Sequence, residues 1–220
     1  MSIHRPATDP HLARTLERIY RALLGRFGCQ HWWPGTAEEM VIGSVLTQYT
    51  RWENAELALH RLRARRLGNL AGVAGLTNAA LGRLVRPAGC ASVKAERLRA
   101  VAGWIEARGG LTGLRRLPTA RLRTGLCGVR GIGPETADAI LLYALGRPVF
   151  VVDDYTRRVL HRYGILTGHE RYGAVQQLLH SSLPPEPALY GEYHALIVRL
   201  AKTHCRVKPS CAGCPLARLT

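Results

Sequence analysis

Apolar residues recur every three or four positions along most of this 220-residue chain, which is the period of an amphipathic helix. The first such stripe predicts a helix over 11–27. A second helix is expected over 38–46, after a capping box from Thr36 to Glu39; it is apolar on nearly every side and should be buried. No convincing strand-like alternation occurs, and the apolar run 149–152 is too short to found a sheet. The pattern indicates an all-α protein.

The same spacing recurs further along and predicts roughly ten helices in all. The remaining ones are expected at 52–65, in short pieces within 67–81, at 92–108, from Pro118, and at 135–145, 155–164, 172–183 and 189–203. A chain of this length forms one large domain or two small ones that share a core. We expect two helical lobes, one made of 36–145 and the other of 1–35 together with 146–220.

A tight turn, Gly131-Ile132-Gly133, stands between two of these helices. Pro134 follows at the first turn of the next helix, where its missing N–H costs nothing. Backbone N–H groups at such a turn point outward at the positive end of the helix dipole, which favours an anion such as phosphate. The stretch therefore predicts a helix-hairpin-helix that grips a nucleic-acid backbone without reading its sequence. The alternative is a turn that only joins two packed helices.

Charge strengthens the nucleic-acid interpretation. The chain has 31 Lys and Arg against 15 Asp and Glu, a formal net charge of +16, and arginine dominates the surplus. Such a balance points to a polyanion as partner, although an arginine-rich composition can also decorate an ordinary surface. The polar N-terminus shows no secretion signal, no segment is apolar enough to span a membrane, and three of the six cysteines crowd the C-terminal end. We expect a cytoplasmic protein that binds no membrane.

Three motifs in order, GVRGIGPETADAI, Val152-Asp153 and the cysteine tail, resemble the endonuclease III family. That family consists of helix-hairpin-helix DNA glycosylases of base-excision repair. The resemblance extends from about Leu23 to Cys214. It implies a monomeric enzyme that hydrolyses the N-glycosidic bond of a damaged base in double-stranded DNA. The DNA would lie across the groove between the lobes.

The resemblance places the catalytic aspartate at Asp153. Cleavage of an N-glycosidic bond builds positive charge on the sugar, and a fixed carboxylate stabilises that charge. The simpler interpretation is that Asp153 or Asp154 caps the following helix, since Asp is a favoured cap. We expect Asp153 to be catalytic and Asp154 to be the cap.

Glu135 departs from the pattern of bifunctional family members, which carry a lysine at this place in the hairpin. That lysine attacks the sugar and allows strand cleavage through a Schiff base, which a carboxylate cannot form. The resemblance therefore implies a monofunctional glycosylase that leaves an abasic site. Glu135 in the first turn also suits the helix dipole, and both interpretations can hold together.

The N-terminal segment resembles the 3-methyladenine glycosylase branch of the family. The motifs that carry this likeness are Trp32-Trp33-Pro34, Thr47-Gln48-Tyr49-Thr50, Trp52-Glu53-Asn54 and Arg86-Pro87-Ala88-Gly89. Gln48 corresponds to the residue that the family inserts into the gap left by the extruded base. Trp32, Trp33 and Trp52 are candidates to stack on a cationic alkylated purine, although most tryptophans only pack in cores. Tyr49 stands where the branch has a small polar residue, which alters the expected pocket.

The tail reads Cys205-x5-Cys211-x2-Cys214, with Thr220 where family members with a [4Fe-4S] cluster have their fourth cysteine. Three alternatives follow: a cluster on three cysteines with an unusual fourth ligand, a loop that folds without a cluster, or a zinc site that includes His204. The other cysteines, Cys29, Cys90 and Cys127, are expected to be buried.

Two further expectations concern residues without an assigned role. His194 is expected to be an ordinary core residue, and the basic helix that contains Lys94 and Arg97 a solvated face. The predicted activity is excision of an alkylated purine. An oxidised-pyrimidine or mismatch glycosylase on the same frame is the enzymatic alternative. A lesion-binding protein without catalysis is the alternative of another class.

Overall fold

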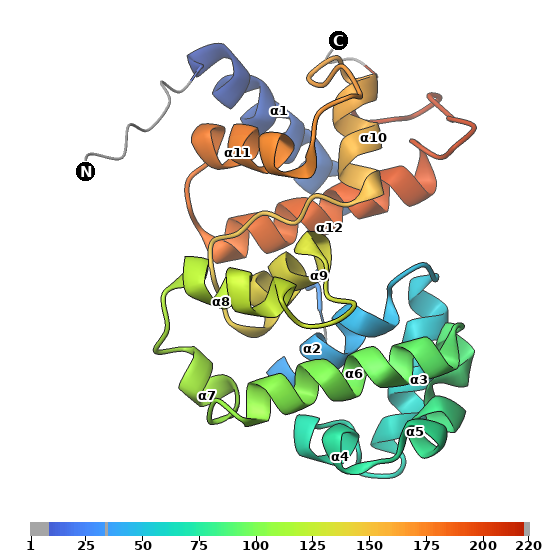
Figure 1. The fold of residues 1–220 in the computed structure, drawn as a ribbon. Coiled ribbons are helices and arrows are strands. Elements are labelled where there is room, and N and C mark those ends of the chain that lie inside the picture. The colour runs from blue at the N-terminus through green and yellow to red at the C-terminus, as the bar shows by residue number, and fades with distance from the viewer. Residues whose placement is uncertain (1–8, 34, 218–220) are drawn as a thin grey trace. The chain divides into compact units, whose positions relative to one another are not determined.

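The computed structural model describes residues 9–33 and 35–217, and all regular structure in that part of the chain is helical (Figure 1). The all-α prediction is therefore confirmed. The chain divides into two compact units. One contains the described residues up to Trp32 and from Pro148 onward, and the other contains Trp33–Arg147. Within the described residues, no helix combines the length and the apolar character that a membrane crossing needs.

The helices are grouped by unit. The first unit contains α1 (Pro10–Phe27), α10 (Asp154–Arg162), α11 (Tyr172–Ser182) and α12 (Pro187–Thr203). The second contains α2 (Ala37–Leu46), α3 (Trp52–Arg63), α4 (Leu70–Gly75), α5 (Asn78–Val85), the 3₁₀ turn η1 (Arg86–Ala88), α6 (Ala91–Glu106), α7 (Gly110–Leu114), α8 (Thr119–Cys127), α9 (Pro134–Ala139) and the π-helical segment η2 (Ile140–Ala144) that continues it.

Local signals begin the first two helices. The Asp9 carboxylate accepts the N–H groups of His11 and Leu12 and so caps α1. Thr36 and Glu39 form both hydrogen bonds of the predicted capping box, which is confirmed. Glu39 also binds Arg63 through two hydrogen bonds of 2.5 and 3.0 Å, which ties α2 to α3. The hydrogen bond from Arg63 lowers the pKa of Glu39 despite the opposing effect of burial.

Helix α12 forms the centre of the first unit. Its Tyr190 and Tyr193 side chains are completely buried. The Tyr193 hydroxyl donates to the backbone carbonyl of Leu16 in α1 at 2.8 Å, so this buried phenol keeps a partner. The Phe150 ring meets both tyrosine rings edge-on, with centroids 5.3 and 6.0 Å away. Aromatic packing of this kind fixes the start of the segment that leads to α10.

That segment, Val149–Val152, has no regular secondary structure and is buried, and no strand of the described residues lies beside it. Its backbone groups bind side chains of α11 instead. The N–H of Phe150 donates to His180 Nε2 at 2.9 Å, and Gln176 Nε2 donates to the carbonyl of Phe150 at 2.7 Å. Buried backbone groups must find partners, and here side chains supply what a neighbouring strand would normally give.

In the second unit, Lys94 corrects the expectation of a solvated basic face on α6. Its side chain is 2 % exposed, and its ammonium group donates to the carbonyls of Leu46 and Ala88 at 2.9 and 2.5 Å. Leu46 is the last residue of α2, where carbonyls lack helical partners and the dipole is negative, so a cation is stabilised there. Burial nevertheless lowers the pKa of Lys94.

Replacement of Gln176 tests the role of α11. Gln176→Met removes the donor to the buried Phe150 carbonyl, and we expect the free energy of unfolding to fall by about 1–3 kcal/mol. The neighbouring Gln177 is exposed, so Gln177→Met should change the free energy of unfolding by less than about 0.5 kcal/mol. Urea denaturation of both variants measures the difference. Equal stabilities would show that the hydrogen bond does not hold the segment.

Candidate active site

Asp153 follows the buried segment Val149–Val152 and stands immediately before α10. Its Oδ1 atom accepts the N–H of Thr156 at 2.7 Å, which makes Asp153 the N-cap of the helix. The expectation that Asp154 is the cap is therefore wrong, because Asp154 is already the first helical residue and is exposed. The cap uses one oxygen of Asp153 and leaves the other available for a second interaction.

His194 on α12 supplies that second interaction. Its Nε2 atom lies 3.3 Å from Asp153 Oδ2, and its side chain is buried. Sequence reasoning treated His194 only as a core residue, because 41 positions separate it from Asp153 and no local pattern joins them. The core expectation is correct as far as burial goes, but the histidine also faces the candidate catalytic carboxylate.

These contacts set the charge state of Asp153. Burial raises the pKa of the carboxyl group, but the neighbouring His194 and the Thr156 N–H together outweigh it, so that the pKa lies below its ordinary value. Asp153 is therefore a carboxylate at neutral pH. It is held at both oxygens, which orients it before any ligand arrives.

The predicted hairpin lies in the second unit, between α8 and α9. Gly131 has φ of 81°, and a Cβ there would approach Arg97 to 2.5 Å, so the turn requires glycine on both grounds. Gly131, Gly133 and Glu135 are all exposed, and Gly133 is the N-cap of α9. Arg123 holds the two helices together through a bidentate pair, at 2.7 and 2.9 Å, with the fully buried carboxylate of Asp138.

Gln48 joins the turn after α2 to this hairpin. Its Nε2 atom donates to the Gly131 carbonyl at 3.1 Å and to the Thr136 hydroxyl at 2.9 Å. Its Oε1 atom accepts from Arg97 at 2.7 Å. The next residue, Tyr49, is 98 % exposed. The structure therefore brings together Gln48 and the hairpin, two features that the sequence analysis assigned separately to DNA contact.

The three candidate tryptophans are placed differently. Trp33 is buried and meets Trp52 edge-on at 4.8 Å, and a Cβ on Gly43 would overlap its ring. Trp52 lines a pocket of the second unit whose other walls are Gly35, Glu56, Leu59 and Arg63. Trp32 belongs to the first unit, and Pro34 of the same motif lies outside the described residues. Of the three, only Trp52 both packs against an aromatic partner and lines this pocket.

The described residues of the cysteine tail form no assembled group of metal ligands. Within the described part of the chain, no group of three or more His, Cys, Asp and Glu could hold a metal ion, and this part includes Cys205, Cys211, Cys214 and His204. In this part of the chain, neither a cluster on the three cysteines nor a zinc site with His204 has an assembled group of ligands. Thr220, the expected fourth position, lies outside the described residues.

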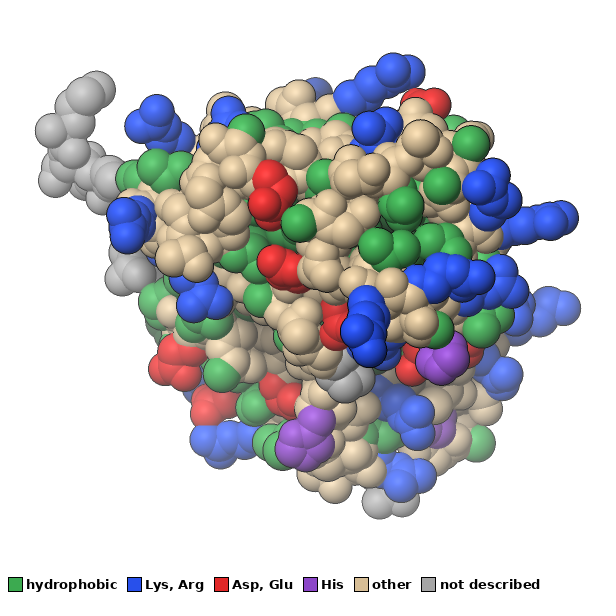
Figure 2. Space-filling view, turned by 90° about the horizontal axis from the view of Figure 1, so that it is seen from below, with side chains coloured by type: hydrophobic (Ala, Val, Ile, Leu, Met, Phe, Trp, Pro, Cys, Tyr) green, Lys and Arg blue, Asp and Glu red, His purple; other side chains and the backbone are tan. Residues whose placement is uncertain are grey.

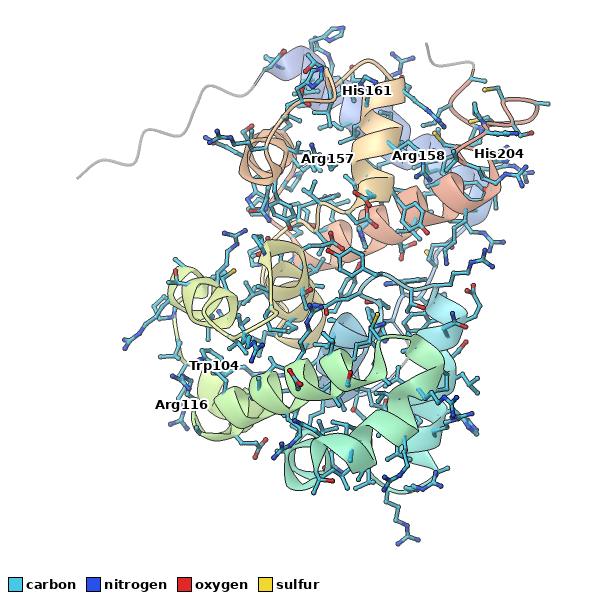
Figure 3. The ribbon with its side chains drawn as sticks, turned by 45° about the vertical axis from the view of Figure 1, so that its right-hand side comes forward. Trp104, Arg116, Arg157, Arg158, His161 and His204 are labelled. Atoms are coloured by element: carbon cyan, nitrogen blue, oxygen red, sulfur yellow. The ribbon has the colours of Figure 1, made fainter. Side chains whose placement is uncertain are left out.

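Arginines of α10 hold the tail loop instead. Arg158, labelled on α10 in Figure 3, donates to the carbonyl of Cys205 at 2.8 Å. Arg162 donates to the carbonyls of Arg206 and Val207 at 2.6 and 3.0 Å. Arg162 also lies 3.5 Å from the Cys205 sulfur. These bonds satisfy loop carbonyls without any ligand.

Two of the remaining cysteines were also predicted wrongly. Cys29 and Cys90 are exposed rather than buried, and Cys127 is half-buried. Cys29 follows the end of α1, and Cys90 stands just before α6, so both occupy connections. Loops run over the surface, which explains why an apolar neighbourhood in the sequence did not bury these thiols.

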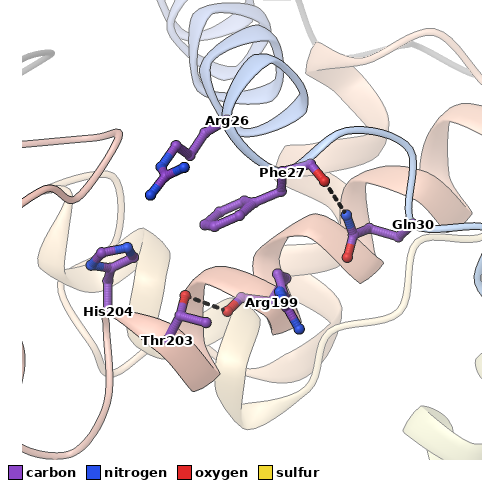
Figure 4. Close-up of a pocket in the computed structure, with 6 residues that line it drawn as sticks. All are labelled: Arg26, Phe27, Gln30, Arg199, Thr203 and His204. Carbon is purple, nitrogen blue, oxygen red and sulfur yellow. Dashed lines mark hydrogen bonds between the residues drawn. The ribbon is translucent and has the colours of Figure 1, made fainter.

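Positive charge is spread over many elements. Figure 2 shows lysine and arginine side chains projecting at many points of one face, with fewer acidic side chains between them. In the first unit, the ends of α1 and α12 form a pocket whose lining includes Arg26, Arg199 and His204 but no carboxylate (Figure 4). Such a distribution favours polyanions in general over one small anion.

With the N-capping Asp153 and the exposed hairpin glycines located, comparison with known proteins identifies the family. Residues 42–185 match the HhH-GPD superfamily of base excision DNA repair proteins, and the chain belongs to this superfamily. A Methanocaldococcus jannaschii protein named as a DNA repair glycosylase is 40% identical over 90% of this chain and 92% of its own length.

Two solved structures extend the likeness. Helicobacter pylori 3-methyladenine DNA glycosylase, bound to 1,N6-ethenoadenine, has a TM-score of 0.73 and 26% identity over 86% of this chain and 97% of its own. An endonuclease III–DNA complex has a TM-score of 0.79 and 20% identity over 94% of each chain, which shows a shared fold. The predicted resemblance to the endonuclease III family is confirmed.

Because the pKa of Asp153 is lowered, we expect the free energy of unfolding to depend on pH. The folded carboxyl group holds its proton less tightly than the unfolded one, so its ionisation stabilises the fold above the unfolded pKa of about 3.9. That contribution is lost as the pH falls through the folded pKa. We expect the stability difference between wild type and Asp153→Asn to shrink as the pH falls below about pH 4.

Urea denaturation at a series of pH values measures this difference. Asp154→Asn is the matched control, because Asp154 is adjacent and exposed, and it should change stability by less than about 0.5 kcal/mol. A difference for Asp153→Asn that stays the same from pH 6 to about pH 3 would show that the charge of Asp153 contributes nothing to stability.

Proposed function

We propose that this protein is a DNA glycosylase that hydrolyses the N-glycosidic bond of a damaged base in double-stranded DNA. The observation that carries the proposal is the state of Asp153, an ionised carboxylate held through both oxygens. A carboxylate fixed before the reaction stabilises developing positive charge without reorganisation. Membership of a base excision repair superfamily supports the same conclusion.

The chemistry follows from the charge that the reaction creates. As the bond between sugar and base lengthens, the sugar gains oxocarbenium character, and the negative charge of Asp153 stabilises it. The same carboxylate can orient the water that completes hydrolysis. His194 acts through Asp153 as a positioning residue, since its imidazole lies 3.3 Å from the Oδ2 atom. The hairpin at Gly131 and Gly133 supplies backbone amides for a DNA phosphate.

We further propose that the enzyme is monofunctional. The hairpin carries Glu135 in the first turn of α9, at the place where the bifunctional endonuclease III type has a lysine. A carboxylate has no amine to form an imine with the sugar, so the strand stays intact after base release.

The substrate we propose is an alkylated purine. Trp52 offers an aromatic surface in a pocket whose lining also includes Glu56 and Arg63, and an aromatic face suits a flat, electron-poor base. The likeness to a 3-methyladenine DNA glycosylase supports this choice.

Base release should appear as a strand break only after alkali. Duplexes that carry 3-methyladenine, 7-methylguanine, thymine glycol or uracil are incubated with the protein and then resolved with and without hot alkali. We expect alkali-dependent breaks in the alkylated-purine duplexes alone, because the DNA strand at an abasic site stays intact until alkali cleaves it. Breaks without alkali would contradict the role given to Glu135. Release of thymine glycol or uracil instead would contradict the proposed substrate.

Removal of one charge should separate catalysis from binding. Asp153→Asn keeps an N-capping side chain but loses the negative charge, and we expect excision to fall by at least about 100-fold while affinity for the lesion duplex changes by less than about threefold. Single-turnover excision and fluorescence anisotropy measure the two quantities. Asp154→Asn should excise at the wild-type rate. If Asp153→Asn retains wild-type excision, the mechanism is wrong.

A further inference from the structure

The turn after α2 presents an unusual side chain. Tyr49 is 98 % exposed, the largest exposed fraction among the large apolar side chains of the described residues. Its φ of 53° lies in the left-handed region, which a bulky residue rarely adopts. A fully exposed aromatic residue in a strained backbone conformation gains nothing from the folded state and points to a binding role.

The turn that carries Tyr49 is held from several sides. Lys94 binds the carbonyl of Leu46 at its base, and the N–H of Thr50 donates to the carbonyl of Thr47 at 3.2 Å across it. Gln48 fastens it to the hairpin at Gly131. These hydrogen bonds hold the backbone of the turn, so Tyr49 projects from a supported position beside the hairpin proposed to bind the DNA backbone.

Gln48 and Tyr49 differ in the number of side-chain hydrogen bonds that would break if each side chain entered DNA. Both donor hydrogens of the Gln48 amide are engaged, and its oxygen accepts from Arg97. Entry of Gln48 into a duplex would break all three hydrogen bonds and release the turn from the hairpin. Tyr49 is exposed over nearly its whole surface, and its entry would leave that network intact.

We propose that Tyr49, rather than Gln48, is the side chain that enters the duplex at the lesion, and that Gln48 is the anchor that positions it. The inference rests on the proposed function, since it assigns a role within the same DNA complex. The phenol ring would stack on the bases beside the extruded nucleotide, where any base offers a flat surface. Arg97 and Thr136 hold Gln48, so they support the wedge without touching DNA bases.

The experiment compares two duplexes of one sequence, one intact and one with a tetrahydrofuran abasic-site analogue. Fluorescence anisotropy gives the dissociation constant of each. We expect Tyr49→Ala to weaken binding to the abasic duplex by about tenfold and to the intact duplex by less than about twofold, because stacking is gained only where a base is missing. Tyr49→Phe keeps the ring and should bind both as wild type does.

Gln48→Ala provides the contrast. Loss of the Gln48 anchor should lower the melting temperature of the protein. It should also weaken binding to both duplexes by a similar factor, because the turn is no longer fastened to the hairpin. Tyr49→Ala should leave the melting temperature unchanged, since the side chain packs against little in the fold. Equal binding of the abasic duplex by wild type and Tyr49→Ala would overturn the inference, as would a selective loss in Gln48→Ala alone.

Base release by the wild-type protein is measured on the same preparation. If the wild-type protein excises a damaged base and Tyr49→Ala binds the abasic duplex as tightly as wild type does, the role proposed for Tyr49 is wrong and the glycosylase proposal stands. If Tyr49→Ala loses affinity for the abasic duplex alone and the wild-type protein releases no base from any lesion, the role of Tyr49 stands and the glycosylase proposal is wrong. Failure of the wild-type protein to bind either duplex would overturn both.

Discussion

The need to satisfy buried backbone groups decides where the candidate catalytic residue lies. Val149–Val152 is irregular and buried, no strand of the described residues lies beside it, and His180 and Gln176 bind the backbone groups of its Phe150. Each missing bond would leave a buried polar group at a cost of about 1–3 kcal/mol. Because the segment is fixed in this way, Asp153 at its end meets α10 and His194 in one orientation. The position of the carboxylate is thus set by the packing of α11.

The same arrangement recurs elsewhere in the chain. In each case a helical side chain binds the backbone carbonyls of a loop or of a helix end, and so holds the loop residues next to it. Lys94 of α6 holds the end of α2, just before the turn with Gln48 and Tyr49. Arg162 of α10 holds the carbonyls of the cysteine loop. Helices give these side chains a rigid base, so the loops gain precision that their own backbone could not provide.

Local chemistry explains which parts of the fold could be predicted. Helix starts at Asp9 and Thr36, and the turn at Gly131, depend on residues within a few positions of one another, and the sequence displays them directly. The period of the apolar residues gave most helices, with ends that differ by a few positions. The π-helical segment Ile140–Ala144 had no such signal in the sequence.

Contacts between distant positions explain what was missed. Lys94 binds a carbonyl 48 positions away, and the Asp153–His194 pair spans two helices that no periodicity connects. The cap at Asp153 was assigned to Asp154, since both are aspartates and only the exact start of α10 separates them. Three cysteines at suggestive spacing indicate a metal, but spacing does not show whether thiols converge, and among the described residues they form no group of ligands.

Two positions of the site differ in how tightly the fold constrains them. Glu135 is exposed in the first turn of α9, where the helix dipole favours a carboxylate but the backbone does not require one. Asp153 is required by the fold as a cap, yet asparagine caps a helix equally well. The cap therefore explains a short polar side chain at 153 but not its charge. The charge has a partner in His194 and a use in stabilising a cationic sugar, and it is this charge, rather than the presence of a capping residue, that argues for catalysis.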